Sequence, residues 1–142
     1  MTNSILFLDL DDTIFQTKFR NKNGVYPATE TEKKQNISYM TEYQKILFDM
    51  FLSIENLKII PLTARILEQY KRTFLYNQNI LKANSNLDID TYSLYFGGKI
   101  FINNELDLFW EEKITNYYKN MNINLLAMYD QISKIMIKSL SE

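Results

Sequence analysis

The chain has 142 residues, a formal net charge of -1 and 46% hydrophobic residues, which is enough for one folded domain with a sizeable core. Because the charge is near neutral and the basic residues are scattered, the sequence excludes a broad basic surface for nucleic acid or for a membrane. The absence of cysteine and histidine excludes disulfides, thiolate zinc sites and a histidine base, so any chemistry must use carboxylates, hydroxyls, lysine, arginine or an oxygen-bound cation.

The first predicted element is a short strand over residues 5–8. A continuous apolar run without alternation is typical of a strand buried on both faces, as in a parallel sheet. The residues before it lack the basic segment of a signal peptide, and Asp9 ends the apolar run too soon for a membrane span. We therefore expect a cytoplasmic protein without a membrane partner.

A polar, irregular stretch over residues 14–37 predicts a long loop or flap, because it contains a glycine and a proline and shows no periodicity. Thr41 and Gln44 then form the pattern of a capping box, which predicts a helix from this point to about Phe51. Its predicted core-facing residues are Ile46, Leu47 and Met50.

The remaining elements alternate between strand and helix. Strands are predicted over residues 57–62, 92–96 and 99–102, and helices over about 66–76, 108–118 and 124–140. Residues 77–90 are expected to connect two elements, and Asn103 and Asn104 to form a turn. The order predicts one α/β domain over residues 1–142, with a Rossmann-like, mostly parallel sheet and C-terminal helices over about 108–140.

Two acidic residues follow the first strand directly. Asp9 and Asp11 are two positions apart, so in an extended chain they project to the same side. Ligands of parallel sheets bind at this end of the strands, and Mg²⁺ is a natural partner for two close carboxylates and a phosphate. One carboxylate could then attack phosphorus while the other transfers protons. The alternative is a solvated loop or a cap for the next element.

The second strand ends in Thr63, Ala64 and Arg65. The Thr63 hydroxyl could donate to a phosphate oxygen, and the planar fork of Arg65 could contact the same group. The alternative for Thr63 is an ordinary helix N-cap, and the alternative for Arg65 is a surface charge.

These segments together resemble the haloacid dehalogenase superfamily. The resemblance rests on residues 9–13 (DLDDT) after a hydrophobic strand and residues 62–65 (LTAR) after a second one. Residues 97–102 and 107–110 look like the branch that contains sucrose-phosphate and trehalose-phosphate phosphatases. The resemblance implies that Asp9 is the nucleophile, that Asp11 is the general acid and base and a metal ligand through its backbone carbonyl, and that Thr63 binds the phosphoryl group. It further implies Mg²⁺ and hydrolysis of small phosphorylated metabolites, often sugars.

The chain also departs from this family. The family uses a downstream lysine and a second acidic pair, and residues 116–142 match neither, so the resemblance implies a core that stops before these motifs and before the cap module. Lys99 and Lys113 stand in the wrong context to replace the lysine.

Two alternatives to a phosphatase stay open. The first is a catalytically inactive domain of the same ancestry that acts as a binding or interaction module. In that case the apolar face of the predicted helix over 124–140 either forms a homodimer or packs on its own domain. The second is a receiver-like phosphoacceptor domain. The sequence disfavours it, because a receiver's accepting aspartate ends the third strand and the third strand here ends in two glycines, Gly97 and Gly98.

Overall fold

The computed structural model describes residues 4–80, 89–120, 131 and 134. The chain divides into two compact units, Met1–Leu108 and Phe109–Glu142. The first unit contains every residue predicted for the site. The expected single domain over residues 1–142 stays a prediction.

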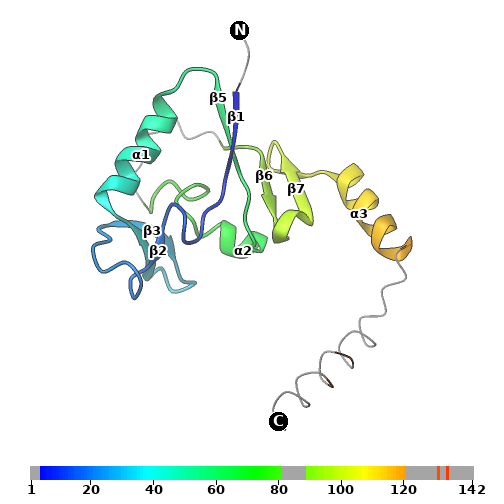
Figure 1. The fold of residues 1–142 in the computed structure, drawn as a ribbon, viewed down its shortest axis with the longest axis horizontal. Helices are drawn as coiled ribbons and strands as arrows, with labels where there is room; N and C mark the ends of the chain where they lie inside the picture. Colours follow the sequence, from blue (N-terminus) through cyan, green and yellow to red (C-terminus); the bar gives the residue numbers. More distant parts are fainter. Residues whose placement is uncertain (1–3, 81–88, 121–130, 132–133, 135–142) are drawn as a thin grey trace. The chain divides into compact units, whose positions relative to one another are not determined.

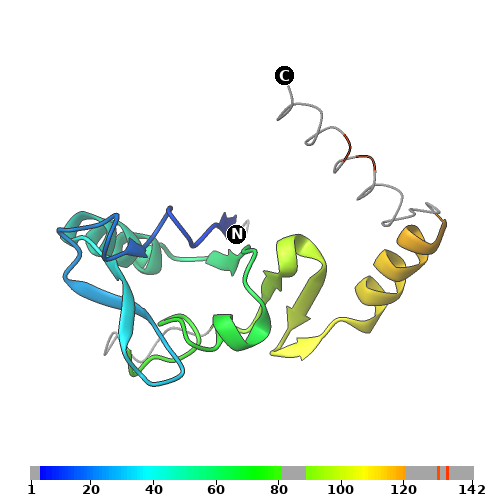
Figure 2. The ribbon, with the colours of Figure 1, turned by 90° about the horizontal axis from the view of Figure 1, so that it is seen from below.

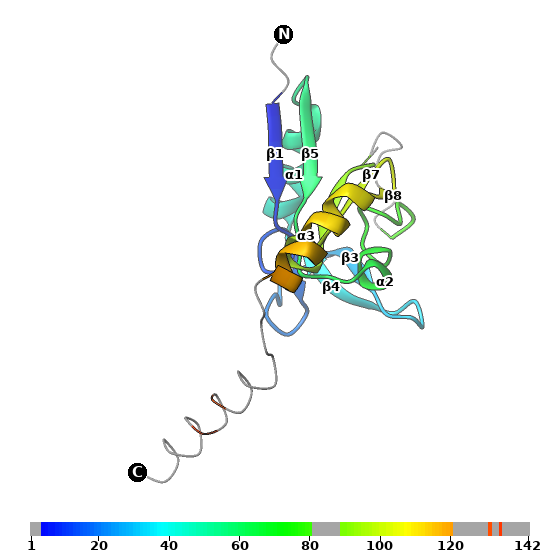
Figure 3. The same ribbon diagram turned by 90° about the vertical axis from the view of Figure 1, so that its right-hand side faces the viewer.

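A parallel strand pair lies at the centre of the first unit. β1 (Ser4–Leu8) and β5 (Leu57–Pro61) lie side by side with Ser4 opposite Leu57 and Leu8 opposite Pro61 (Figure 3). Both strands were predicted from the sequence, and both are confirmed. Pro61 ends β5, where its missing N–H costs the ladder least.

The chain that leaves β5 bridges β1 to a third strand, β6 (Tyr92–Leu94). The Leu62 amide donates to the Leu8 carbonyl at 2.9 Å, and the Thr63 amide donates to the Ser93 carbonyl at 3.0 Å. Leu62 and Ser93 form an isolated parallel bridge. The ends of β1, β5 and β6 therefore lie next to one another in that order.

β1 is not buried on both faces, so this part of the prediction is wrong. Ile5 and Phe7 are 56% and 63% exposed, whereas Leu8 is buried. Within the described part of the chain, β1 pairs with β5 alone. One face of the strand is therefore left open to solvent there, despite its apolar side chains.

The stretch predicted as a flap over residues 14–37 instead contributes most of a three-stranded antiparallel sheet. Its strands are β2 (Gln16–Thr17), β4 (Asn36–Met40) and β3 (Tyr26–Glu30), in that spatial order. The β3–β4 hairpin extends toward the segment that follows α2 (Leu67–Tyr70), as Figure 2 shows. Register shifts within β3 break its two-residue alternation, which is why the sequence pattern hid this strand.

Helix α1 (Glu42–Ser53) begins as predicted and lies alongside the β1–β5 pair (Figure 1). Its capping box is confirmed, since the Gln44 amide donates to the Thr41 hydroxyl at 3.2 Å and the Thr41 amide donates to the Gln44 side chain at 2.9 Å. The predicted core face is wrong, because Phe48 is the buried residue, at 2% exposure. The three residues expected to face the core are at least half exposed: Ile46, Leu47 and Met50.

The helix predicted over residues 66–76 is much shorter in the structure, where α2 covers only Leu67–Tyr70. The chain beyond it pairs with β3 instead of continuing the helix. The Glu30 amide donates to the Arg72 carbonyl at 3.0 Å, and the Phe74 amide donates to the Ala28 carbonyl at 2.8 Å. These bonds use backbone groups that a longer helix would have needed.

The last sheet of the first unit joins β6 to β7 (Lys99–Ile102) and β8 (Glu105–Leu106). The short turn η1 (Tyr95–Gly97) ends β6 two residues earlier than predicted. The predicted turn at Asn103 and Asn104 is confirmed, and both residues have the positive φ angles that tight hairpins require, 54° and 63°.

The described residues thus form a mixed α/β fold. One strand pair is parallel, and the other two sheets are antiparallel, so the described part of the chain does not show the mostly parallel sheet that was expected. Aromatic rings make up much of the core of the first unit. Its fully buried aromatic side chains are Phe15, Tyr70, Phe74 and Tyr92.

The second unit is described mainly by α3 (Leu108–Asn120), which begins at the unit boundary and confirms the helix predicted over residues 108–118. The predicted helix over residues 124–140, and with it the predicted homodimer surface, lies outside the described residues except at Gln131 and Lys134. None of the described helices has the length and apolar character that crossing a membrane requires.

Candidate active site

The loop after β1 presents the two predicted carboxylates outside the core. Leu10 and Phe15 are fully buried, and the Leu10 carbonyl accepts a hydrogen bond from the Ile14 amide at 3.0 Å. These contacts hold the loop in a compact turn. Asp9 and Asp11 flank the buried Leu10, and both are exposed.

Each acidic residue of this loop already has a partner. The Thr13 hydroxyl donates to Asp9 Oδ2 at 2.7 Å. Asp12 forms an exposed ion pair with Arg20 and has a positive φ of 60°, which aspartate tolerates better than most residues. The carboxylates of Asp9 and Asp12 are therefore each bound by a side chain of the loop region and do not rely on water alone.

Thr63 follows β5 and is 3% exposed. Its hydroxyl accepts a hydrogen bond from the Arg65 amide at 3.2 Å, and its carbonyl accepts one from the Phe96 amide at 3.3 Å. The N-cap of the next helix is Ile66, so the alternative interpretation of Thr63 as a helix cap is wrong. In this structure Thr63 stabilises the turn between β5 and Arg65.

Arg65 lies opposite Asp11 and binds it with both arms of its fork. Nε donates to Asp11 Oδ2 at 2.8 Å, and one terminal nitrogen donates to Oδ1 at 2.6 Å. The guanidinium carbon also lies 5.3 Å from the ring centroid of Phe15. The Arg65 side chain is only 16% exposed, so it is more than a free surface charge. Partly exposed ion pairs of this kind contribute about 0–1 kcal/mol, and the two-pronged geometry favours the upper end.

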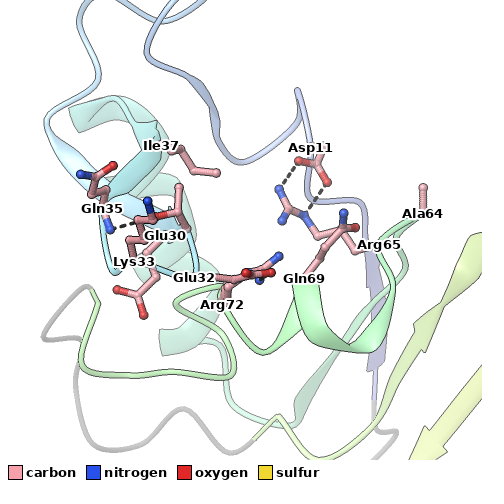
Figure 4. A pocket seen from close by; sticks show the side chains of 11 residues that line it. Asp11, Glu30, Glu32, Lys33, Gln35, Ile37, Ala64, Arg65, Gln69 and Arg72 are labelled. Atoms are coloured by element: carbon pink, nitrogen blue, oxygen red, sulfur yellow. Dashed lines mark hydrogen bonds and ion pairs between the residues drawn. The ribbon is translucent and has the colours of Figure 1, made fainter.

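A cavity of about 730 Å³ opens beside this ion pair. Figure 4 shows the Arg65 fork turned toward Asp11 on one side of it, and Arg72 and Glu32 together on another. Asp9 and Thr63 are not among the lining residues. Most of the lining residues are polar or charged, and they come from the two strand-end loops, the β3–β4 hairpin, α2 and the segment after α2: Asp11, Glu30, Thr31, Glu32, Lys33, Gln35, Ile37, Ala64, Arg65, Gln69 and Arg72.

The hairpin side of this cavity is fixed rather than free to swing. Glu32 pairs with Arg72 at 2.9 Å, and the Asn77 side chain donates to Glu30 at 3.3 Å. Thr29 and Thr73 form a backbone bridge next to these contacts, and both are fully buried. No local pattern in the sequence indicates this wall, because its partners lie about forty or more positions apart along the chain.

The residues present fit only part of a magnesium site. Asp9 supplies a carboxylate, and the Asp11 backbone carbonyl is a second oxygen donor, whereas the Asp11 side chain is engaged by Arg65. No group of three or more acidic residues that could hold a metal ion occurs within the described ranges. Mg²⁺ usually keeps several waters and binds one or two carboxylates together with a substrate phosphate, and the available donors meet that minimum.

No known protein-family model matches this chain, and no curated protein sequence matches it significantly.

Proposed function

We propose that the chain is a phosphatase of the haloacid dehalogenase type that acts on small phosphorylated metabolites. One observation carries the proposal. Two adjacent parallel strands, β1 and β5, deliver Asp9, Asp11, Thr63 and Arg65 to the same end of the sheet, and two of the four, Asp11 and Arg65, line a cavity large enough for a small metabolite. The parallel β1–β5 pair with the bridge to β6 supports a Rossmann-like core.

The chemistry follows from the positions of the two carboxylates. A carboxylate oxygen of Asp9 attacks phosphorus, the bond to the leaving oxygen breaks, and that oxygen takes a proton from Asp11. Water then attacks the aspartyl-phosphate while Asp11 accepts its proton, which releases Asp9 and inorganic phosphate. Mg²⁺, when bound at Asp9 and the Asp11 carbonyl, offsets the charge repulsion between carboxylate and phosphate.

The test is an assay of the full 142-residue chain for Mg²⁺-dependent phosphate release from a generic aryl phosphate. Asp9→Asn keeps the shape of the side chain and removes the nucleophile, so release should fall to background. Asp12→Asn is the matched control, because Asp12 has no role in the proposed reaction and asparagine tolerates its positive φ angle. Full activity in Asp9→Asn would refute the proposal.

A second candidate is a domain of the same ancestry that binds phosphate without turnover. The observation that favours it is the engagement of Asp11 by Arg65, since both oxygens of the proposed acid and base are bound within the protein instead of facing a ligand. Phosphate binding without phosphate release, in wild type and in Asp9→Asn alike, would select this candidate.

A further inference from the structure

Arg65 faces two groups that compete for its fork: the Asp11 carboxylate that it binds in this structure, and any anion that enters the cavity which both residues line. We propose that Arg65 is a positioning residue that exchanges partners, holding Asp11 in the empty site and moving to the phosphoryl group when a ligand enters. This inference rests on the proposed phosphate chemistry of the site.

The surroundings of Arg65 allow its head group to move while its backbone stays in place. Its amide donates to the Thr63 hydroxyl, and its carbonyl accepts a hydrogen bond from the Tyr95 amide at 3.1 Å. The guanidinium also lies over the buried Phe15 ring, which supports the head group from a side that neither anion occupies. Only the two bonds to Asp11 must break in an exchange.

The geometry also gives a phosphate access to the ion pair. Asp11 is 49% exposed at its side chain and Arg65 is 16% exposed, so the carboxylate lies on the open side of the pair. A phosphate dianion offers the planar fork the same two-oxygen contact with a larger charge than a carboxylate. A ligand in the cavity can therefore displace Asp11 from Arg65.

The exchange has a consequence for the reaction. While Arg65 holds both Asp11 oxygens, that side chain is bound by the fork and does not contact a leaving group. Once the fork moves to the phosphoryl group, the Asp11 side chain is free to contact the leaving oxygen. Asp11 would thus become competent only when a phosphate is present.

Binding of inorganic phosphate to the full chain in magnesium-free buffer tests the exchange separately from catalysis. Asp11→Asn removes the competing carboxylate and should tighten phosphate binding roughly fivefold or more, within the range of coupling between residues in contact. The gain should largely disappear in the Asp11→Asn, Arg65→Gln double variant. Asp12→Asn removes the same charge from the same loop and controls for general electrostatics, so its effect should be clearly smaller.

The arginine side chain itself gives the decisive signal. The ¹⁵N resonance of Arg65 Nε, assigned by its loss in Arg65→Lys, should shift on phosphate addition to the wild-type chain. An unmoved Arg65 resonance at saturating phosphate would overturn the inference. So would a gain in Asp11→Asn that persists in the double variant, or an absence of phosphate binding in both wild type and Asp11→Asn. Each of these outcomes is independent of the Mg²⁺-dependent hydrolysis that tests the proposed function.

Discussion

Tyr70 carries a defect that substitution should repair. The residue is fully buried, and its phenol oxygen has no hydrogen-bond partner among the described residues. An unsatisfied buried hydroxyl costs about 1–3 kcal/mol. Tyr70→Phe removes the oxygen and keeps the ring, whose centroid lies 4.5 Å from that of Tyr92 and 6.0 Å from that of Tyr76. We expect Tyr70→Phe to stabilise the fold by about 1 kcal/mol and to raise Tm by about 4–8 °C.

The same residue should make stability depend on pH above the neutral range. Burial, with smaller contributions from Tyr92 and Tyr76, raises the pKa of Tyr70 above its ordinary value of 10.0. The unfolded phenol ionises near that value while the folded one stays neutral. The stability held below pH 10 is therefore lost as pH rises toward the folded pKa, by about 1.4 kcal/mol per pH unit for this group. Tyr70→Phe removes this loss, so its advantage over wild type should widen in alkali.

Urea unfolding followed by far-ultraviolet circular dichroism, at neutral pH and near pH 11, measures both effects. Tyr43→Phe is the matched control, because Tyr43 is 86% exposed and its ring is outside the core. A loss of more than about 1 kcal/mol in Tyr70→Phe at neutral pH would show that the hydroxyl makes a bond, which refutes the reasoning. An advantage that stays constant up to pH 11 would refute the pKa argument alone.

Three further substitutions test the packing of the first unit, with urea unfolding as the measurement. Phe74→Ala should cost about 3–5 kcal/mol, because this fully buried ring joins two others in the core, whereas Phe19→Ala at a 91% exposed position should cost almost nothing. Thr41→Ala removes the cap of α1 and should cost about 1 kcal/mol, and Thr41→Ser should restore most of it. Gly24→Ala should cost about 1–3 kcal/mol, since a Cβ there would lie 2.6 Å from a side-chain carbon of β4. A neutral effect would show that the hairpin shifts enough to accommodate the added methyl group.

The sequence correctly predicted those elements that depend only on residues close together along the chain. The capping box at Thr41 and Gln44 depends on groups three positions apart, and it was predicted correctly. The same is true of β1, β5 and the turn at Asn103 and Asn104, whose residue types match one backbone conformation. The orientation of α1 was not predictable in this way, because several of its faces carry apolar residues and only tertiary contacts bury Phe48.

The antiparallel hairpin was missed for a related reason. Bulges in β3 shift its register against β4 near Thr29, so buried residues do not alternate along it as they do in a regular strand. The shortened α2 follows from the same sheet, because the chain around Arg72 bonds to β3. Neither feature leaves a pattern within a single stretch of sequence.

The candidate site shows the same division between local and long-range information. The spacing of Asp9 and Asp11 predicts that both carboxylates project to the same side of the chain, and the structure shows that both residues are exposed on either side of buried Leu10. The partner of Asp11 is Arg65, 54 positions away. No local pattern indicates whether an arginine at a strand end binds a carboxylate of the same chain or a phosphate ligand. In the proposed exchange Arg65 does both: it binds Asp11 before a ligand enters and binds the phosphoryl group afterwards.

The charge balance of the loop after β1 favours an exchange of partners by Arg65. Asp9, Asp11 and Asp12 bring three carboxylates to one strand end, and the described ion pairs supply two guanidinium groups, from Arg20 and Arg65. The three carboxylates and two guanidinium groups together leave the loop close to neutral. A phosphate dianion entering beside Arg65 would disturb this balance, because it frees Asp11 and adds two charges of its own. The excess negative charge is what a divalent cation at Asp9 would offset, so phosphate and Mg²⁺ should each tighten the binding of the other.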